Sequence, residues 1–353
     1  MSELTPRERV LRTLKGEEVD RPACYSGMGN VTTAGLDQFG YKLAEVHGDA
    51  RKMANSAASS YRLFDYECAV VPFDLCVEAE ALGCVMNPYE DVDLLLYPTI
   101  KEKIVHQESD MTSFKIPENL AESGRVPVVA EAIKILKAEI GNDVPIGTYF
   151  LGPFTLAGQI MDLNDLFKLS FKKQKLVAEM LDRLADVIIK IIPVYEAAGV
   201  DYICIREMGA TTDILSPKIF KSLIQPPLVK IAQNIKVAKI LHICGSTNSV
   251  IKVMNECGYD AISIEQKNDM ARTREDIGNS PLVFGALDAY NVLVNGTPED
   301  VRKATVKCLE DSLDGIWPGC DIWPTAPVAN LKAMTDTVKE FGAQKWQRKA
   351  AVR

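Results

Sequence analysis

The sequence predicts an α/β fold: a (β/α)8 TIM barrel with an N-terminal helical extension and insertions on its rim. Predicted strands alternate with helices about eight times along the chain, which is typical of parallel βαβ units. The chain has 353 residues, a usual length for such a barrel. It contains no Gly-x-Gly-x-x-Gly motif, which disfavours a doubly wound dinucleotide-binding sheet. We therefore expect residues 1–353 to form a single barrel domain of this type.

The first half of the chain begins with the helical extension, because Thr5, Pro6 and Glu8 have the spacing of a capped helix start and Gly16 follows the last apolar position. Beyond it the pattern is less regular. We expect strands at 23–26 and 69–73, a helix at 50–63, a hairpin or rim excursion at 77–87, and an insertion at 91–119.

The second half alternates clearly between the two kinds of element. Strands are expected at 144–150, 201–208, 237–244, 261–265, 282–287 and 315–319. Helices are expected at 127–141, 166–199, 217–237 with an interruption at Pro226 and Pro227, 249–257, 297–313 and 326–342.

Composition excludes several classes of protein. The net charge of −8 and the absence of a Lys/Arg run argue against nucleic-acid binding. No apolar run approaches the roughly 20 residues that span a bilayer, and no signal peptide precedes the first helix. The nine cysteines are scattered without the spacing of a disulfide framework. We therefore expect a cytoplasmic protein with reduced thiols and no membrane partner.

A metal site is predicted at the end of the strand at 237–244. His242 and Cys244 are two residues apart, so on a strand their side chains would point to the same face. Cys320, in a Pro/Gly turn after another apolar run, offers a third ligand. Three such ligands with an open fourth position are typical of a catalytic zinc. The local alternative is a core histidine beside buried thiols.

The barrel prediction favours the metal site, because catalytic residues in such barrels come from the C-terminal ends of the strands. Glu265 ends the strand that follows His242 and Cys244, so a carboxylate should join the ligands at one mouth. Arg206 and Glu207 end another strand, and they either line the mouth or pair with each other. Two further strand-end residues, Asp288 and Tyr290, are candidates for substrate contact, whereas the remaining cysteines are expected to be inert core thiols.

At these residues the chain resembles the methylcobamide:coenzyme M methyltransferases, which belong to the uroporphyrinogen decarboxylase superfamily. The matching motifs are His242-Ile-Cys-Gly, Ile-Ser-Ile-Glu265-Gln-Lys and Pro-Gly-Cys320-Asp-Ile with Pro324 following, and the likeness includes 9–17 and 151–155. The resemblance implies a (β/α)8 barrel with zinc held by His242, Cys244 and Cys320. It also implies that Glu265 can occupy the zinc when the thiol substrate is absent.

The activity implied by the resemblance is zinc-dependent methyl transfer from a methylated corrinoid to a thiol such as coenzyme M, a reaction of methanogenic one-carbon metabolism. Zinc would deprotonate the thiol, which is a poor nucleophile when protonated. The chain has no Asp-x-His-x-x-Gly corrinoid motif of its own. Methylcobalamin or a related corrinoid is therefore expected as a co-substrate, presented by a separate corrinoid protein.

Three alternatives stay open at this point. The same site could work in reverse, as a substrate-specific demethylase that methylates a Co(I) corrinoid protein. Uroporphyrinogen decarboxylation is disfavoured because residues 23–30 contain no arginine to bind the carboxylates of the tetrapyrrole. A non-enzymatic binding module with a structural zinc would need a closed site with four ligands.

Overall fold

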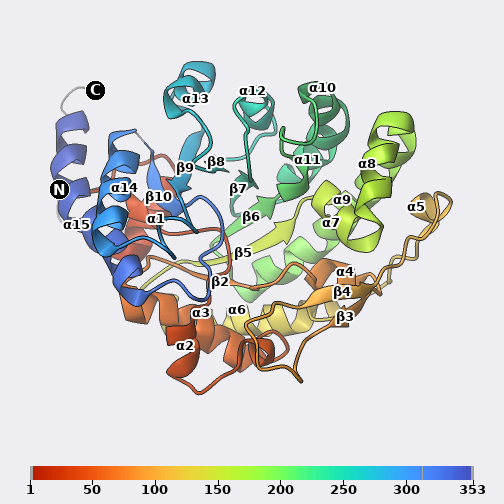
Figure 1. Ribbon diagram of the computed structural model, residues 1–353, viewed down its shortest axis with the longest axis horizontal. Helices are drawn as coiled ribbons and strands as arrows, with labels where there is room; N and C mark the ends of the chain where they lie inside the picture. The colour runs from red at the N-terminus through yellow and green to blue at the C-terminus, as the bar shows by residue number, and fades with distance from the viewer. Residues whose placement is uncertain (1–2, 312, 351–353) are drawn as a thin grey trace.

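In the computed structural model, which describes residues 3–311 and 313–350, parallel strands form the centre of the molecule and helices surround them (Figure 1). The strands are β1 (Ala23–Cys24), β2 (Ala69–Val71), β3 (Val85–Asn87), β4 (Thr99–Glu102), β5 (Ile146–Leu151), β6 (Tyr202–Arg206), β7 (Ala238–Ile243), β8 (Ala261–Ile264), β9 (Leu282–Leu287) and β10 (Gly315–Pro318).

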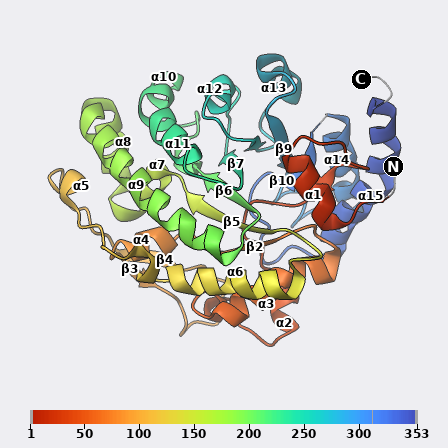
Figure 2. The same ribbon diagram turned by 180° about the vertical axis from the view of Figure 1, so that it is seen from behind.

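The helices follow the strands in the order expected for βα units, as the view from behind also shows (Figure 2). They are α1 (Pro6–Leu14), α2 (Thr33–Asp37), α3 (Ala50–Phe64), α4 (Val77–Ala81), α5 (Asp110–Ser113), α6 (Val126–Ile140), α7 (Pro153–Ile160), α8 (Leu163–Lys172), α9 (Gln174–Ala198), α10 (Pro217–Ile219), α11 (Gln225–Ala232), α12 (Ile251–Asn255), α13 (Met270–Ile277), α14 (Pro298–Glu310) and α15 (Val328–Ala350). Among the described residues, no helix is long and apolar enough to cross a membrane.

The main sheet has the strand order β1-β10-β9-β8-β7-β6-β5-β2, and every neighbouring pair in it is parallel. Its two end strands are joined by a hydrogen bond of 3.0 Å from the amide of Glu67, just before β2, to the carbonyl of Cys24 in β1. The predicted (β/α)8 barrel is therefore confirmed. Helix α1, with the predicted capping box of Thr5 and Glu8, precedes the first strand as the expected extension.

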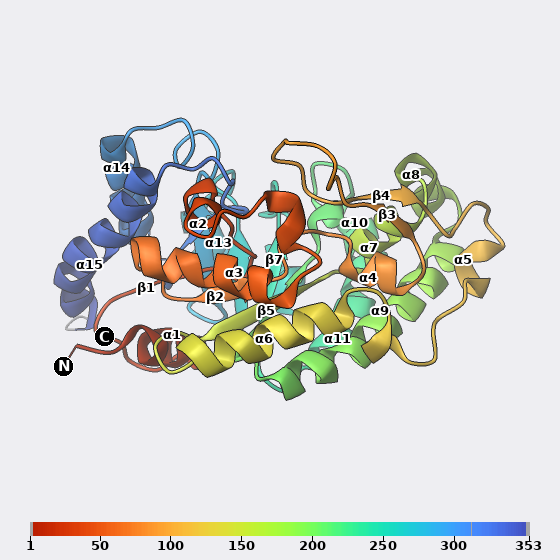
Figure 3. The same ribbon diagram turned by 90° about the horizontal axis from the view of Figure 1, so that it is seen from below.

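Two parts of the chain differ from expectation. The region expected to be a hairpin or a rim excursion, 77–87, contains the short helix α4 followed by β3, and β3 pairs with β4 from the expected insertion at 91–119. This insertion and α5 lie at the opposite end of the molecule from α14 and α15 (Figure 3). The helix expected at 217–237 is interrupted close to Pro226 and Pro227, but the break is a π-helical turn at Phe220–Ile224 and the last part, α11, ends at Ala232. The two prolines lie in the first turn of α11.

The barrel interior is filled by aromatic side chains. Trp317 of β10 stacks on Phe284 of β9 with ring centroids 5.5 Å apart, and Tyr25 meets Trp317 edge-on at 5.3 Å. All three side chains are fully buried. A ligand can therefore reach the barrel only at its mouth, where the C-terminal ends of the strands lie.

Glu67 connects α1, β1 and β2 below the mouth. Its carboxylate accepts hydrogen bonds from the Arg9 guanidinium, from Arg21 Nη2 at 2.9 Å and from the Cys24 amide at 2.7 Å. Arg9 is buried and also binds Asp20. Where the barrel closes, this charged network thus adds side-chain hydrogen bonds to the backbone bond between the Glu67 amide and the Cys24 carbonyl.

We expect Glu67→Gln to lower the free energy of unfolding by roughly 3–5 kcal/mol, because it leaves buried guanidinium groups short of a counter-charge. Urea denaturation measures the change. The matched control is Glu139→Gln, whose carboxylate is exposed and pairs with Arg51 and Arg62, and which should cost less than about 1 kcal/mol. Equal losses in the two variants would contradict a special role for Glu67.

Candidate metal centre at the barrel mouth

The predicted ligands come from three strands that end at the mouth. His242 is in β7, and Cys244 follows the last residue of that strand. Glu265 follows β8, and Cys320 lies two residues after β10. Gly319 permits this approach, because a Cβ there would lie 2.5 Å from Gln266 Oε1 and 3.3 Å from Glu265 Cα.

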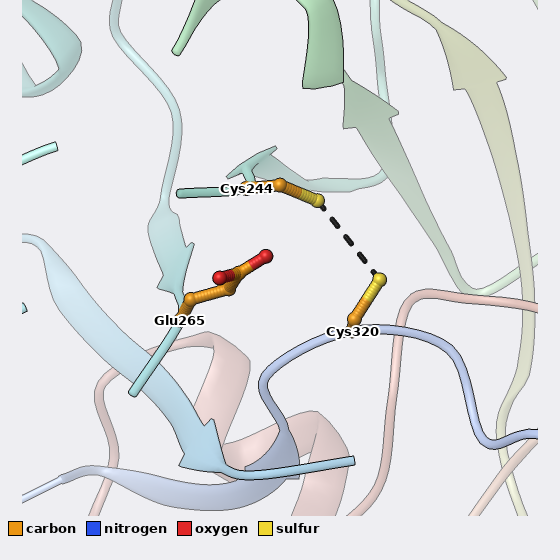
Figure 4. Close-up of side chains that lie close together, drawn as sticks. All are labelled: Cys244, Glu265 and Cys320. Atoms are coloured by element: carbon orange, nitrogen blue, oxygen red, sulfur yellow. Dashed lines mark hydrogen bonds between the residues drawn. The ribbon is translucent and has the colours of Figure 1, made fainter. Parts of the chain in front are cut away.

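Cys244, Glu265 and Cys320 form a compact group whose side chains point toward one another (Figure 4). The two sulfur atoms are 4.0 Å apart, and both lie within 4.8 Å of a carboxylate oxygen of Glu265. For two cysteine ligands of one tetrahedral zinc, a Zn–S bond of about 2.3 Å requires a sulfur–sulfur distance of about 3.8 Å. The separation and the kind of donor atoms therefore fit a zinc ion.

His242 stands beside this group. Its Nε2 is 3.1 Å from Cys244 Sγ, and its Nδ1 is 3.0 Å from Ser263 Oγ. His242 and Ser263 are register partners on β7 and β8, so their side chains share a face of the sheet. If Nδ1 donates to the hydroxyl, the Nε2 lone pair is free for a metal. Sequence reasoning missed Ser263, because a serine in an apolar strand carries no signal of its own.

The thiols of Cys244 and Cys320 differ in pKa. A hydrogen bond from Cys244 lowers the pKa of Cys320 well below the usual range, and the same contact raises the pKa of Cys244. The Arg206 guanidinium also lowers the pKa of Cys320. A thiolate is the form that binds metals, so the site already favours one anionic sulfur.

Arg206 and Glu207 do not pair with each other. Arg206 forms an ion pair with Asp321, the residue after Cys320, and its guanidinium lies 4.6 Å from the centre of the Tyr149 ring. Glu207 accepts hydrogen bonds from the amides of Phe154 and Thr155 at the start of α7, and burial raises its pKa to about 7. Glu207 therefore fixes the start of α7, whereas Arg206 is part of the site at the barrel mouth.

Of the candidate ligands, Cys320 lines a mostly apolar cavity of about 390 Å³. Its lining includes Asp74, Tyr97, Asp321 and Trp323. This volume is in the range that holds a small ligand. A second hollow of about 510 Å³, between 103–108 and α8, shares no lining residue with it.

The other predicted contact residues lie farther out on the rim. Asp288 caps the turn after β9 by accepting hydrogen bonds from the Tyr290 and Asn291 amides. Tyr290 is half exposed and lies against Trp323, with ring centroids 5.1 Å apart. The cysteines outside the site are buried, and burial raises the pKa of Cys204 in the barrel wall to about 12.

Comparison with known proteins places this site in a family. The uroporphyrinogen decarboxylase family model matches residues 5–341, so the chain belongs to that family. Within it, the chain is 31% identical to the methylcobamide:CoM methyltransferase MtaA of Methanosarcina barkeri, over 97% of this chain and 100% of the relative. It is 32% identical to the methylcobamide:CoM methyltransferase MtbA of Methanosarcina acetivorans, over 97% and 99% of the two chains.

The similarity extends to three dimensions. The solved structure of a methyltransferase from Methanosarcina mazei matches with a TM-score of 0.90 at 30% sequence identity, covering 96% of this chain and 99% of that one. The likeness suggested by the motifs at the mouth is therefore confirmed at the level of the whole fold, and it lies with the methyltransferases of the family.

The difference in pKa between Cys244 and Cys320 predicts which cysteine an alkylating reagent modifies in metal-free protein. Iodoacetamide should modify Cys320 before the other cysteines and should still do so at pH 6, where an ordinary thiol with a pKa near 8.5 is almost fully protonated. Peptide mass spectrometry locates the label. Cys244→Ala removes the hydrogen-bond donor and should slow the reaction at pH 6. Labelling that follows an ordinary thiol titration would contradict the assignment.

Proposed function

We propose that the protein is a zinc-dependent methyltransferase that moves a methyl group from a methylated corrinoid to a small thiol. The observation that carries the proposal is the pair of sulfurs 4.0 Å apart with a carboxylate beside them at the barrel mouth. Similarity to methylcobamide:CoM methyltransferases supports the same activity. His242, Cys244 and Cys320 would hold the zinc, with Glu265 as the ligand that the thiol replaces.

The chain's own residues would prepare this reaction. When bound, zinc would keep the acceptor thiol deprotonated and nucleophilic. Ser263 fixes the His242 ring, and Gly319 lets Cys320 reach the other donors. The cavity of about 390 Å³ suits a small acceptor, so the far larger corrinoid would be presented at the mouth by a separate corrinoid protein.

Metal dependence is the direct test. Zinc-replete protein should contain about one zinc per chain and should demethylate methylcobalamin in the presence of a thiol, as followed by the corrinoid spectrum. Removal of the metal by a chelator should abolish turnover, and zinc should restore it. Cys320→Ser should lose most of the zinc and the activity together, whereas Cys308→Ser, in a buried site on α14, should retain both. A folded, active protein without transition metal would refute the proposal.

A second experiment tests the direction of methyl transfer. The reverse reaction is measured with Co(I) cobalamin and a panel of methyl ethers, methylamines and thioethers, and formation of methylcobalamin at a higher rate than thiol methylation would favour the demethylase. A closed, exchange-inert tetrahedral site after metal replacement would favour a structural zinc instead.

Glu265→Gln tests the role of the carboxylate. A carboxamide is a weaker zinc ligand than a carboxylate, so the variant should keep its metal and bind the acceptor thiol more tightly, by about tenfold or about 1.4 kcal/mol. Calorimetric titration with 2-mercaptoethanesulfonate gives the dissociation constant, and Glu299→Gln on the exposed face of α14 is the control. An unchanged affinity would show that Glu265 does not compete with the thiol.

A further inference from the structure

The buried guanidinium of Arg206 pairs with Asp321, whose side chain is 33% exposed, and this ion pair uses only part of the hydrogen-bonding capacity of Arg206. Its side chain is 1% exposed, and Nη2 is the nitrogen that contacts Asp321 Oδ2 and Met208 Sδ. Nε and Nη1 are buried without a hydrogen-bond partner among the described residues, and so is Asp321 Oδ1. Buried charged donors without partners are rare in folded proteins and call for a specific explanation.

Arg125 is a second buried arginine close to the cavity, and its hydrogen bonds are those expected of an arginine with a structural role. Both of its Nη atoms bind the carboxylate of Asp74, at 2.7 and 2.8 Å, and its Nε binds Glu80 at 2.7 Å. Each guanidinium nitrogen is thus engaged. The vacant donors of Arg206 are therefore not a general feature of this end of the barrel.

The position of Arg206 ties it to the candidate metal centre. Arg206 of β6 and His242 of β7 are register partners, so both side chains emerge on the same face of the sheet. Its counter-ion Asp321 follows Cys320 directly, with Oδ2 3.9 Å from Cys320 Sγ. Cys320 and Asp321 both line the cavity. A charged group on a short thiol bound at the two sulfurs would thus lie beside this ion pair.

We propose that Arg206 recognises the anionic end, a sulfonate or a carboxylate, of the acceptor thiol, an inference that rests on the proposed function. The two unpartnered nitrogens would donate to the anion, as guanidinium groups do to such oxygens. Asp321 holds the guanidinium through a single oxygen in the absence of substrate, and Tyr149 supports its face. Arg206 is then a specificity-determining residue that selects short anionic thiols over neutral or cationic ones.

Binding of the tail alone tests the site without turnover. Calorimetric titration with ethanesulfonate and with propionate, in the absence of thiol and corrinoid, should show binding to the wild type and none to Arg206→Met. Asp321→Asn removes the competing charge and should bind these anions at least about threefold more tightly. Arg302→Met, which removes one charge from an exposed pair with Glu340, is the matched control and should bind as the wild type does.

Turnover gives the second readout. The ratio of kcat/KM for 2-mercaptoethanesulfonate or 3-mercaptopropionate to that for 2-mercaptoethanol should exceed one in the wild type. It should fall at least about tenfold in Arg206→Met, chiefly through KM. Arg206→Lys keeps the charge without the planar guanidinium and should recover part of the ratio. Comparison of the two anionic thiols shows whether sulfonate or carboxylate is preferred.

The outcomes separate this inference from the proposed function. Methylation of all thiols with equal efficiency, together with no binding of ethanesulfonate, overturns the role of Arg206 and leaves the methyltransferase intact. Binding of ethanesulfonate that depends on Arg206, in a protein that methylates no thiol, supports the anion site and removes the proposed function. If Arg206→Met does not fold, inhibition of the wild type by ethanesulfonate but not by 1-propanol supports the inference, and equal effects of both overturn it.

Discussion

The register between β6, β7 and β8 is the constraint on which the site depends. Arg206, His242 and Ser263 occupy matched positions on these three parallel strands. Side chains at matched positions share a face, and a slip of one residue would turn each of them to the other side of the sheet. The closed barrel leaves little freedom for such a slip, and the Glu67 network joins its two end strands. Packing far from the mouth therefore fixes the relative positions of the side chains in the site.

The guanidinium of Arg206 is a buried cation that lies among several acidic groups at the mouth, and its charge affects their pKa values. The hydrogen bond from Cys244 and the charge of Arg206 lower the pKa of Cys320, whereas the contact with Cys320 and burial raise the pKa of Cys244 and Arg206 only opposes that rise. Burial raises the pKa of Asp321, and Arg206 opposes that rise as well. A cation in this position favours thiolates, which a metal requires, and it also attracts an anionic substrate. Both effects come from the same charge, so the guanidinium links acceptor recognition to the metal ligands.

The sequence predicted the barrel and the approach of Cys244, Glu265 and Cys320, because strand alternation and strand-end position are local properties of the chain. His242 lies next to this group, in contact with Cys244. The Arg206–Asp321 pair was beyond such reasoning, since its members are 115 positions apart and meet only when β6 and β10 face each other across the mouth. Ser263 was missed for a similar reason. Its role follows from register with His242, which no pattern within β8 reveals.

The segment after β1 explains why this barrel suits methyl transfer better than decarboxylation of a polycarboxylate. Residues 23–30 carry no arginine, and the fold leaves little space for one at Gly29, where a Cβ would lie 1.8 Å from the Pro72 carbonyl oxygen. At Gly27 a Cβ would lie 2.7 Å from Trp317. An arginine is therefore excluded at these two glycines, and no residue of 23–30 supplies a cation for several carboxylates. Beside Cys320 the mouth instead carries the Arg206–Asp321 ion pair, and under the proposed function its guanidinium would meet a single anionic group on a small thiol.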